Sequence, residues 1–201
     1  MAPRQPKETR RKILDAAFWE IYRNGYQGAS IDRILEGTAV TKGALFHHFP
    51  NKRQLGYVVV DELVRSWVRE HWIQPVAADA DPGSAVSACL REYLDRMPDE
   101  VIHGGCPLNN VTQEMAGVDE GFRGRLESIA GEWREAVAGM WRRGQADGYG
   151  VGLEATSAAV LIVSSIEGLL GAAKSAKSRT LAAQGADSLV ELLGLVGRPG
   201  S

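Results

Sequence analysis

Cysteine is scarce in this chain of 201 residues, which has only Cys89 and Cys106. Two cysteines cannot form a disulfide framework, so we expect a reducing, cytoplasmic environment. The basic N-terminal residues are not followed by an apolar stretch, so we expect no signal peptide. The most apolar run, residues 155–166, contains four Ser and Thr residues and stops at Glu167. This run is too short and too polar to span a bilayer, and we expect no membrane segment.

Catalytic and metal-binding motifs are also missing from the sequence. It contains no G-x-S-x-G, Walker loop, H-E-x-x-H or dinucleotide fingerprint, so we expect neither an enzyme nor a bound cofactor. His103 and Cys106 have the spacing H-x-x-C, but no further Cys/His cluster completes four ligands, and we expect no metal. No stretch of useful length alternates between polar and apolar residues as a strand does.

The net charge of −2 hides an asymmetry along the chain. Residues 1–56 hold ten Lys and Arg against five Asp and Glu, whereas the remaining residues carry a net charge of −7. A basic segment on an acidic body favours a polyanionic partner for that segment alone, although a solvated basic face would have the same composition.

Helical periodicity dominates the rest of the sequence. Apolar residues recur at three- and four-residue spacing, and cap residues, Pro and Gly mark the breaks. We interpret Pro75, Pro82 and Gly83 as breaks, residues 98–105 as a loop, and Asn51 as a helix cap. The fold class is therefore all-α with about nine helices, which we place at residues 7–24, 30–37, 41–48, 51–73, 84–97, from Pro107, 119–146, 153–174 and 179–195.

Two short helices, at 30–37 and 41–48, follow a longer one and form a helix-turn-helix, with Ser30 and Thr41 as N-caps. The second helix of such a motif enters the major groove, so its outer positions must be small or polar. Lys42 can donate to guanine or phosphate, and small residues let the backbone approach the bases. On this basis we assign DNA contacts to Thr41, Lys42, Gly43 and Ala44, and backbone clamps to His47, His48 and Lys52.

The surrounding residues carry a family resemblance. They are TRRKILDAA at 9–17, NGY at 24–26, Ser30-Ile31 and VTKGALFHHFPNK at 40–52. This pattern resembles the DNA-binding domain of tetracycline-repressor-type (TetR/AcrR) transcriptional regulators over about residues 7–60. The resemblance implies a homodimeric repressor that binds an inverted-repeat operator in double-stranded DNA. It adds Ser30, Arg33 and Phe46 to the expected DNA contacts.

Two positions depart from the family's pattern. The family usually has Tyr at position 46, whose hydroxyl bonds a phosphate; Phe46 lacks that group, so we assign the contact to His47. The turn usually has Gly at position 39. Holding Ala39 in a left-handed conformation costs roughly 1–2 kcal/mol, so we expect a slightly different turn.

The resemblance further implies a helix-turn-helix domain at residues 1–52, a linking helix at about 51–73, and a ligand-binding and dimerisation domain at 53–201. Aromatic, sulfur-containing and amide residues in the body are candidates for binding an unknown small-molecule effector: Trp67, Tyr93, Met97, Cys106, Asn109, Asn110, Gln113, Phe122, Trp133, Met140 and Trp141. The alternative for each aromatic residue is a place in the core, where helical aromatic side chains usually lie.

Residues 153–196 are rich in apolar side chains that predict a homodimer interface, with an intramolecular core as the alternative. They include Ala158, Ala159, Leu161, Ile162, Ile166, Leu169, Leu170, Leu189, Leu192, Leu193 and Val196. Cys106 precedes Pro107 and can act as a redox sensor or as a small capping or pocket residue. Together with these features, the resemblance implies a repressor that is released from its operator by an effector. An activator of the same fold, or a small-molecule or redox-sensing protein without DNA readout, remains the alternative.

Overall fold

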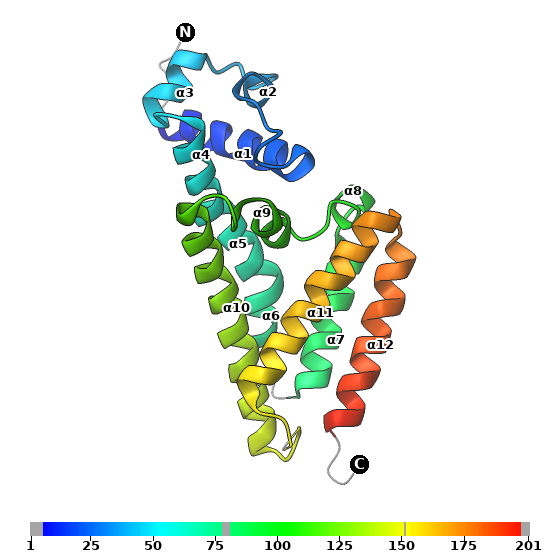
Figure 1. Cartoon of the computed structure of the whole chain (residues 1–201). Coiled ribbons are helices and arrows are strands. Elements are labelled where there is room, and N and C mark those ends of the chain that lie inside the picture. The colour runs from blue at the N-terminus through cyan, green and yellow to red at the C-terminus, as the bar shows by residue number, and fades with distance from the viewer. Residues whose placement is uncertain (1–5, 78–80, 151, 198–201) are drawn as a thin grey trace. The chain divides into compact units, whose positions relative to one another are not determined.

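A computed structural model of the protein describes residues 6–77, 81–150 and 152–197 (Figure 1). Every regular element within these residues is helical and none is a strand, which confirms the predicted all-α fold. The elements are α1 (Pro6–Asn24), α2 (Ile31–Leu35), α3 (Lys42–His48), α4 (Lys52–Val58), the π-helical η1 (Val59–Val64), α5 (Arg65–Val68), the π-helical η2 (Arg69–Ile73), α6 (Gln74–Ala77), α7 (Pro82–Arg96), α8 (Asp99–Ile102), α9 (Pro107–Met115), α10 (Glu120–Ala146), α11 (Ala155–Ala176) and α12 (Arg179–Gly197).

The chain divides into two compact units. The first unit comprises the residues up to Ser66 together with Pro107–Glu127, and the second comprises Trp67–Cys106 and the residues from Ser128 onward. These units follow from contacts alone, so a division of function near residue 52 stays a prediction.

In the first unit, α1 contacts α2, α3, α4 and η1. The buried face of α1 consists of Ile13, Leu14, Ala17, Phe18, Ile21 and Tyr22. Ile34, Leu45 and Phe49 add the inward side chains of α2 and α3. The predicted N-caps are confirmed. Ser30 Oγ accepts from the Arg33 amide at 3.2 Å, Thr41 Oγ1 from the Ala44 amide at 3.2 Å, and Asn51 Oδ1 from the Gln54 amide at 2.9 Å. Each such cap stabilises its helix by about 1 kcal/mol.

The linking helix continues past its predicted end at residue 73. Helical structure runs from Lys52 to Ala77 and includes Pro75, so the interpretation of Pro75 as a break was wrong. Proline has no N–H to offer the carbonyl four residues earlier, here that of His71. The Cys89 thiol of α7 donates to this carbonyl at 3.0 Å. Wider π-helical turns commonly mark such irregular stretches within long helices.

In the second unit, α12 packs against both α7 and α11, as Figure 1 shows. The interior contains the rings of Trp72 and Trp133, whose centroids lie 5.5 Å apart. Arg179, at the start of α12, donates to the Asp99 carboxylate at 2.7 Å and to the Met97 carbonyl at 2.5 Å. Asp99 begins the short helix α8, which lies within the segment predicted to be a loop, so that prediction was wrong.

Most of the apolar residues of α11 and α12 are buried within the protomer. Among those predicted for a dimer interface, Leu161 and Leu192 are exposed, whereas the side chain of Val196 lies outside the described residues. The buried members are Ala158, Ala159, Ile162, Ile166, Leu170, Leu189 and Leu193. The intramolecular alternative therefore explains much of this apolar content.

Helix α11 is longer than the apolar run that we identified from the sequence. Its 22 residues have a mean hydropathy of 1.6, enough by length and composition to cross a membrane. One face of the helix is buried within the second unit and packs on α12. A buried core helix satisfies the same criteria of length and composition, so α11 is weak evidence for a membrane span.

Candidate functional site

Helix α3 presents a polar and small-residue face to solvent. Lys42, Gly43 and His47 are exposed, and an added Cβ at Gly43 would meet nothing within 4 Å. Phe46 is 40% exposed, whereas phenylalanine side chains are most often buried. On the opposite side, Leu45 is fully buried and anchors the helix. The helix is therefore held from behind and leaves its outer face free for a partner.

The turn before α3 adopts a left-handed conformation at Ala39, although the alanine at this position predicted a different turn. Ala39 has φ of 51°, and Gly37, two residues earlier, has φ of 73°. Only glycine adopts such angles without a steric cost. The expectation of a different turn was therefore wrong, because Ala39 itself adopts the left-handed conformation.

Lys42 forms an exposed ion pair with Asp32, which would compete only weakly with DNA for the lysine. Its ammonium nitrogen lies 2.9 Å from the carboxylate of Asp32 in α2, and both side chains are more than half exposed. Exposed ion pairs of this kind contribute at most about 1 kcal/mol. Lys42 can therefore exchange Asp32 for a phosphate or a guanine edge at little cost.

Three other predicted DNA-binding residues take part in contacts inside the first unit. Ser30 caps α2, and Arg33 donates through Nε to the Glu20 carboxylate at 2.6 Å and also to the Gly28 carbonyl. Lys52 donates to the Gln27 carbonyl at 3.1 Å, and burial lowers its pKa. Arg33 and Lys52 thus fix the turn between α1 and α2, a role that the sequence did not indicate.

The sequence also gave no indication of Glu114 in α9. Its carboxylate accepts hydrogen bonds from the backbone amides of Tyr26 and Gln27, both at 2.7 Å. Lys52 lies over the Tyr26 ring, 4.9 Å from its centroid. One carboxylate thus binds two amides of the turn that leads into the helix-turn-helix.

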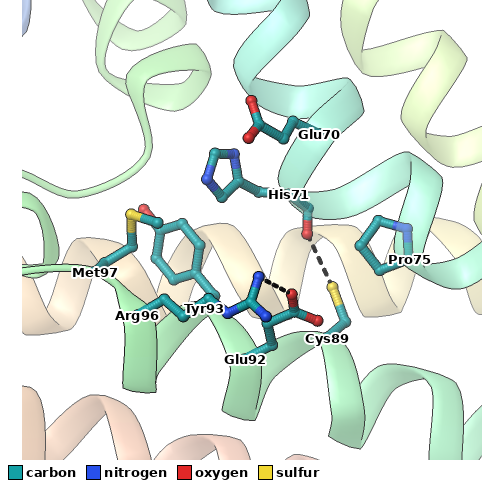
Figure 2. A pocket seen from close by; sticks show the side chains of 8 residues that line it. All are labelled: Glu70, His71, Pro75, Cys89, Glu92, Tyr93, Arg96 and Met97. Atoms are coloured by element: carbon teal, nitrogen blue, oxygen red, sulfur yellow. Dashed lines mark hydrogen bonds and ion pairs between the residues drawn. The ribbon is translucent and has the colours of Figure 1, made fainter.

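The second unit contains a cavity of about 170 Å³ between η2, α6 and α7 (Figure 2). Figure 2 shows Glu70 and His71 on one side and Tyr93 and Met97 on the other. Pro75, Cys89, Glu92 and Arg96 complete the lining. Burial, together with Glu92, raises the pKa of the Cys89 thiol to about 12.

Of the residues predicted to bind a ligand, Tyr93 and Met97 line this cavity, and the Trp67 ring stacks on His71 at 4.6 Å. The others lie elsewhere. Phe122 packs on Tyr26 and belongs to the first unit, where α9 carries Asn109, Asn110 and Gln113. The remaining four candidates are buried in the core: Cys106, Trp133, Met140 and Trp141.

Cys106 is only 2% exposed, so its thiol has little access to a soluble oxidant in this conformation. Its assignment as a redox sensor stays a prediction. Among the residues that the structure describes, no group of three or more His, Cys, Asp and Glu side chains is arranged to hold a metal ion.

Comparison with known families identifies both parts of the chain. Residues 13–55 match the model for bacterial regulatory proteins of the tetR family, and residues 82–189 match the tetracyclin repressor-like C-terminal domain. The chain is 32% identical to an uncharacterized HTH-type transcriptional regulator of Lactococcus lactis, covering 66% of this chain and 67% of that one. It is 45% identical to the Tn10 TetC protein of Escherichia coli, covering 71% of each.

A solved structure shares the fold over nearly the whole length. The TetR transcriptional regulator of Chloroflexus aurantiacus superimposes with a TM-score of 0.84 at 26% identity, covering 98% of this chain and 99% of that one. The helix-turn-helix and the helical body thus both have counterparts in one known protein.

Proposed function

The chain belongs to the TetR family of bacterial transcriptional regulators, and from this premise we propose that it is a homodimeric repressor released from its operator by a small molecule. The exposed face of α3, buttressed by Leu45, is the observation that carries the proposal. A helix held this way can enter a major groove without disturbing its own core.

We assign direct base contacts to Thr41, Lys42, Gly43 and Ala44, at the start of α3. Phe46, His47 and His48 would lie against the flanking sugar-phosphate backbone. Ser30, Arg33 and Lys52 would reach phosphates from the turn that they also hold together. The proposed operator is an inverted repeat, because a two-fold dimer presents two identical recognition helices.

The proposed dimer forms through the outer face of α11 and α12. Val160 and Leu161 of α11 are 52% and 57% exposed, and Leu192 of α12 is 60% exposed. Large apolar side chains grouped on two contacting helices are a typical self-association surface. The buried apolar residues of α11 and α12 pack inside the protomer and are not part of this proposed interface.

The cavity at Glu70 and His71 is our candidate for the effector site. It borders η2, which belongs to the continuous helical stretch from Lys52 to Ala77. An effector acts by binding one of two conformations more tightly. We propose that binding beside η2 favours a conformation in which the two recognition helices no longer fit successive major grooves.

Sedimentation velocity combined with DNA-binding anisotropy tests this proposal. We expect a dimer whose affinity for DNA falls steeply with salt, since several phosphates are neutralised. Leu161→Glu with Leu192→Glu should give a folded monomer that binds an inverted repeat weakly. Val118→Glu, at a residue that is 68% exposed in the first unit, is the matched control and should leave the dimer intact. A wild-type monomer that binds with salt-independent affinity would contradict the proposal.

A further inference from the structure

The size of the cavity beside η2 limits what it can hold. At about 170 Å³ it is close to the roughly 150 Å³ engineered cavity that admits benzene. A single ring with a short substituent fills such a volume. A larger ligand would have to extend past the exposed rim into solvent or displace the walls.

Aromatic groups form and support one wall of the cavity. His71 Nδ1 lies 2.9 Å from the carbonyl oxygen of Trp67. A carbonyl only accepts, so Nδ1 carries the hydrogen and the ring is fixed in orientation. The Trp67 ring stacks on the His71 ring with centroids 4.6 Å apart, and the Tyr93 ring meets the His71 ring edge-on with centroids 5.5 Å apart.

The charges at the rim favour a cation. Glu92 and Arg96 form an ion pair at 2.6 Å across one turn of α7, so these two charges offset each other. Glu70 has no hydrogen bond or ion pair with any other described residue. An anionic ligand would face Glu70 and would have to compete with Glu92 for Arg96, whereas a cation would meet an available carboxylate.

We propose that this cavity binds a small organic cation with one aromatic ring, such as an arylalkyl ammonium ion. The ring lies among His71, Tyr93 and Met97, and the ammonium group donates to the Glu70 carboxylate. Charge-assisted hydrogen bonds and aromatic contacts are the interactions that proteins use for such ligands. That the cation acts as the effector rests on the proposed function; that it binds here does not.

Isothermal titration calorimetry on the full chain, with three probes of matched shape, tests the proposal. The probes are benzylammonium, benzyl alcohol and benzoate. We expect saturable binding of benzylammonium, with benzyl alcohol several-fold weaker and benzoate weakest. Glu70→Gln should weaken benzylammonium on the order of fivefold, because the lost partner is charged but lies at a solvent-exposed rim. Its effect on benzyl alcohol should be small.

Asp95→Asn is the matched control, because it removes one exposed carboxylate of α7 that does not line the cavity. It should leave benzylammonium binding unchanged. Benzoate or benzyl alcohol binding as tightly as benzylammonium, or no saturable binding of benzylammonium, would overturn the proposal. Calorimetry needs no DNA, so a protein that binds benzylammonium but selects no operator would contradict only the proposed function. Operator binding without benzylammonium binding would contradict only this inference.

Discussion

Glu114 and Tyr26 are 88 residues apart in the sequence, yet the Glu114 carboxylate accepts the Tyr26 amide at 2.7 Å. The same carboxylate accepts the amide of Gln27. The turn between α1 and α2 is therefore held by a side chain from α9, within the first compact unit. The turn that leads into the helix-turn-helix thus receives two hydrogen bonds from a segment far outside it in the sequence.

Glu114→Ala should lower the free energy of unfolding by about 1–3 kcal/mol, because two backbone amides lose a charged acceptor. Glu114→Gln, which keeps one acceptor oxygen, should recover part of that loss. Urea unfolding followed by circular dichroism measures both. Asp15→Ala, at an exposed carboxylate of α1, is the control and should have little effect. Equal stabilities for the Glu114 and Asp15 variants would show that the carboxylate does not hold the turn.

Ala39→Gly should stabilise the protein. The left-handed conformation costs alanine about 1–2 kcal/mol, whereas glycine costs about 0.4–1 kcal/mol more entropy on folding. The difference leaves a gain of roughly 0.5–1 kcal/mol, measurable as a higher urea midpoint with an unchanged slope. Ala44→Gly, inside α3, is the opposite control and should destabilise. A loss of stability on Ala39→Gly would mean that Ala39 is not strained.

Lys42→Ala should weaken specific DNA binding by about 1–3 kcal/mol, and Asp32→Asn should not weaken it. The two residues pair in the free protein, so removing Asp32 releases Lys42, whereas removing Lys42 deletes the donor. Anisotropy titrations of a labelled operator compare the two variants. If Asp32→Asn weakened binding as much as Lys42→Ala, the pair itself would be the recognition element.

Stability should fall at alkaline pH through Cys89. Burial raises the pKa of this thiol from an ordinary 9.0 to about 12, so the folded protein keeps a proton that the unfolded chain loses. Below about pH 9 the thiol is protonated in both states and does not change the free energy of unfolding. As pH rises from 9 toward 12, the free energy of unfolding falls by up to about 1.4 kcal/mol per pH unit. Cys89→Ala should show a shallower decline in urea unfolding between pH 8 and pH 10. Parallel curves for the two proteins would contradict a buried, protonated thiol.

Local signals in the sequence account for the helix-turn-helix. Ser30 and Thr41 each cap a helix through an amide three residues away, and the inward positions Ile34 and Leu45 follow from helical spacing alone. The partners in such contacts are only a few residues apart, so the local sequence is enough to predict them.

Contacts between distant segments could not be predicted in the same way. Pro75 would end most helices, and its tolerance here accompanies π-helical turns and a hydrogen bond from Cys89 of another helix. Glu70 and Arg96 have the spacing of ordinary solvent-facing residues, and only the packing of η2 on α7 brings them to one cavity. The aromatic pattern indicated burial, but could not distinguish Tyr93, which lines the cavity, from Trp133 in the core.

Selection of bound duplexes from a random DNA pool, at near-physiological salt, tests the central claim most directly. We predict enrichment of an inverted repeat whose half-sites lie about one helical turn apart. Repeating the selection with Lys42→Ala should reduce the enrichment and relax preference at the positions that this residue reads. No enriched sequence from a folded, dimeric protein would contradict the account of α3 as a recognition helix.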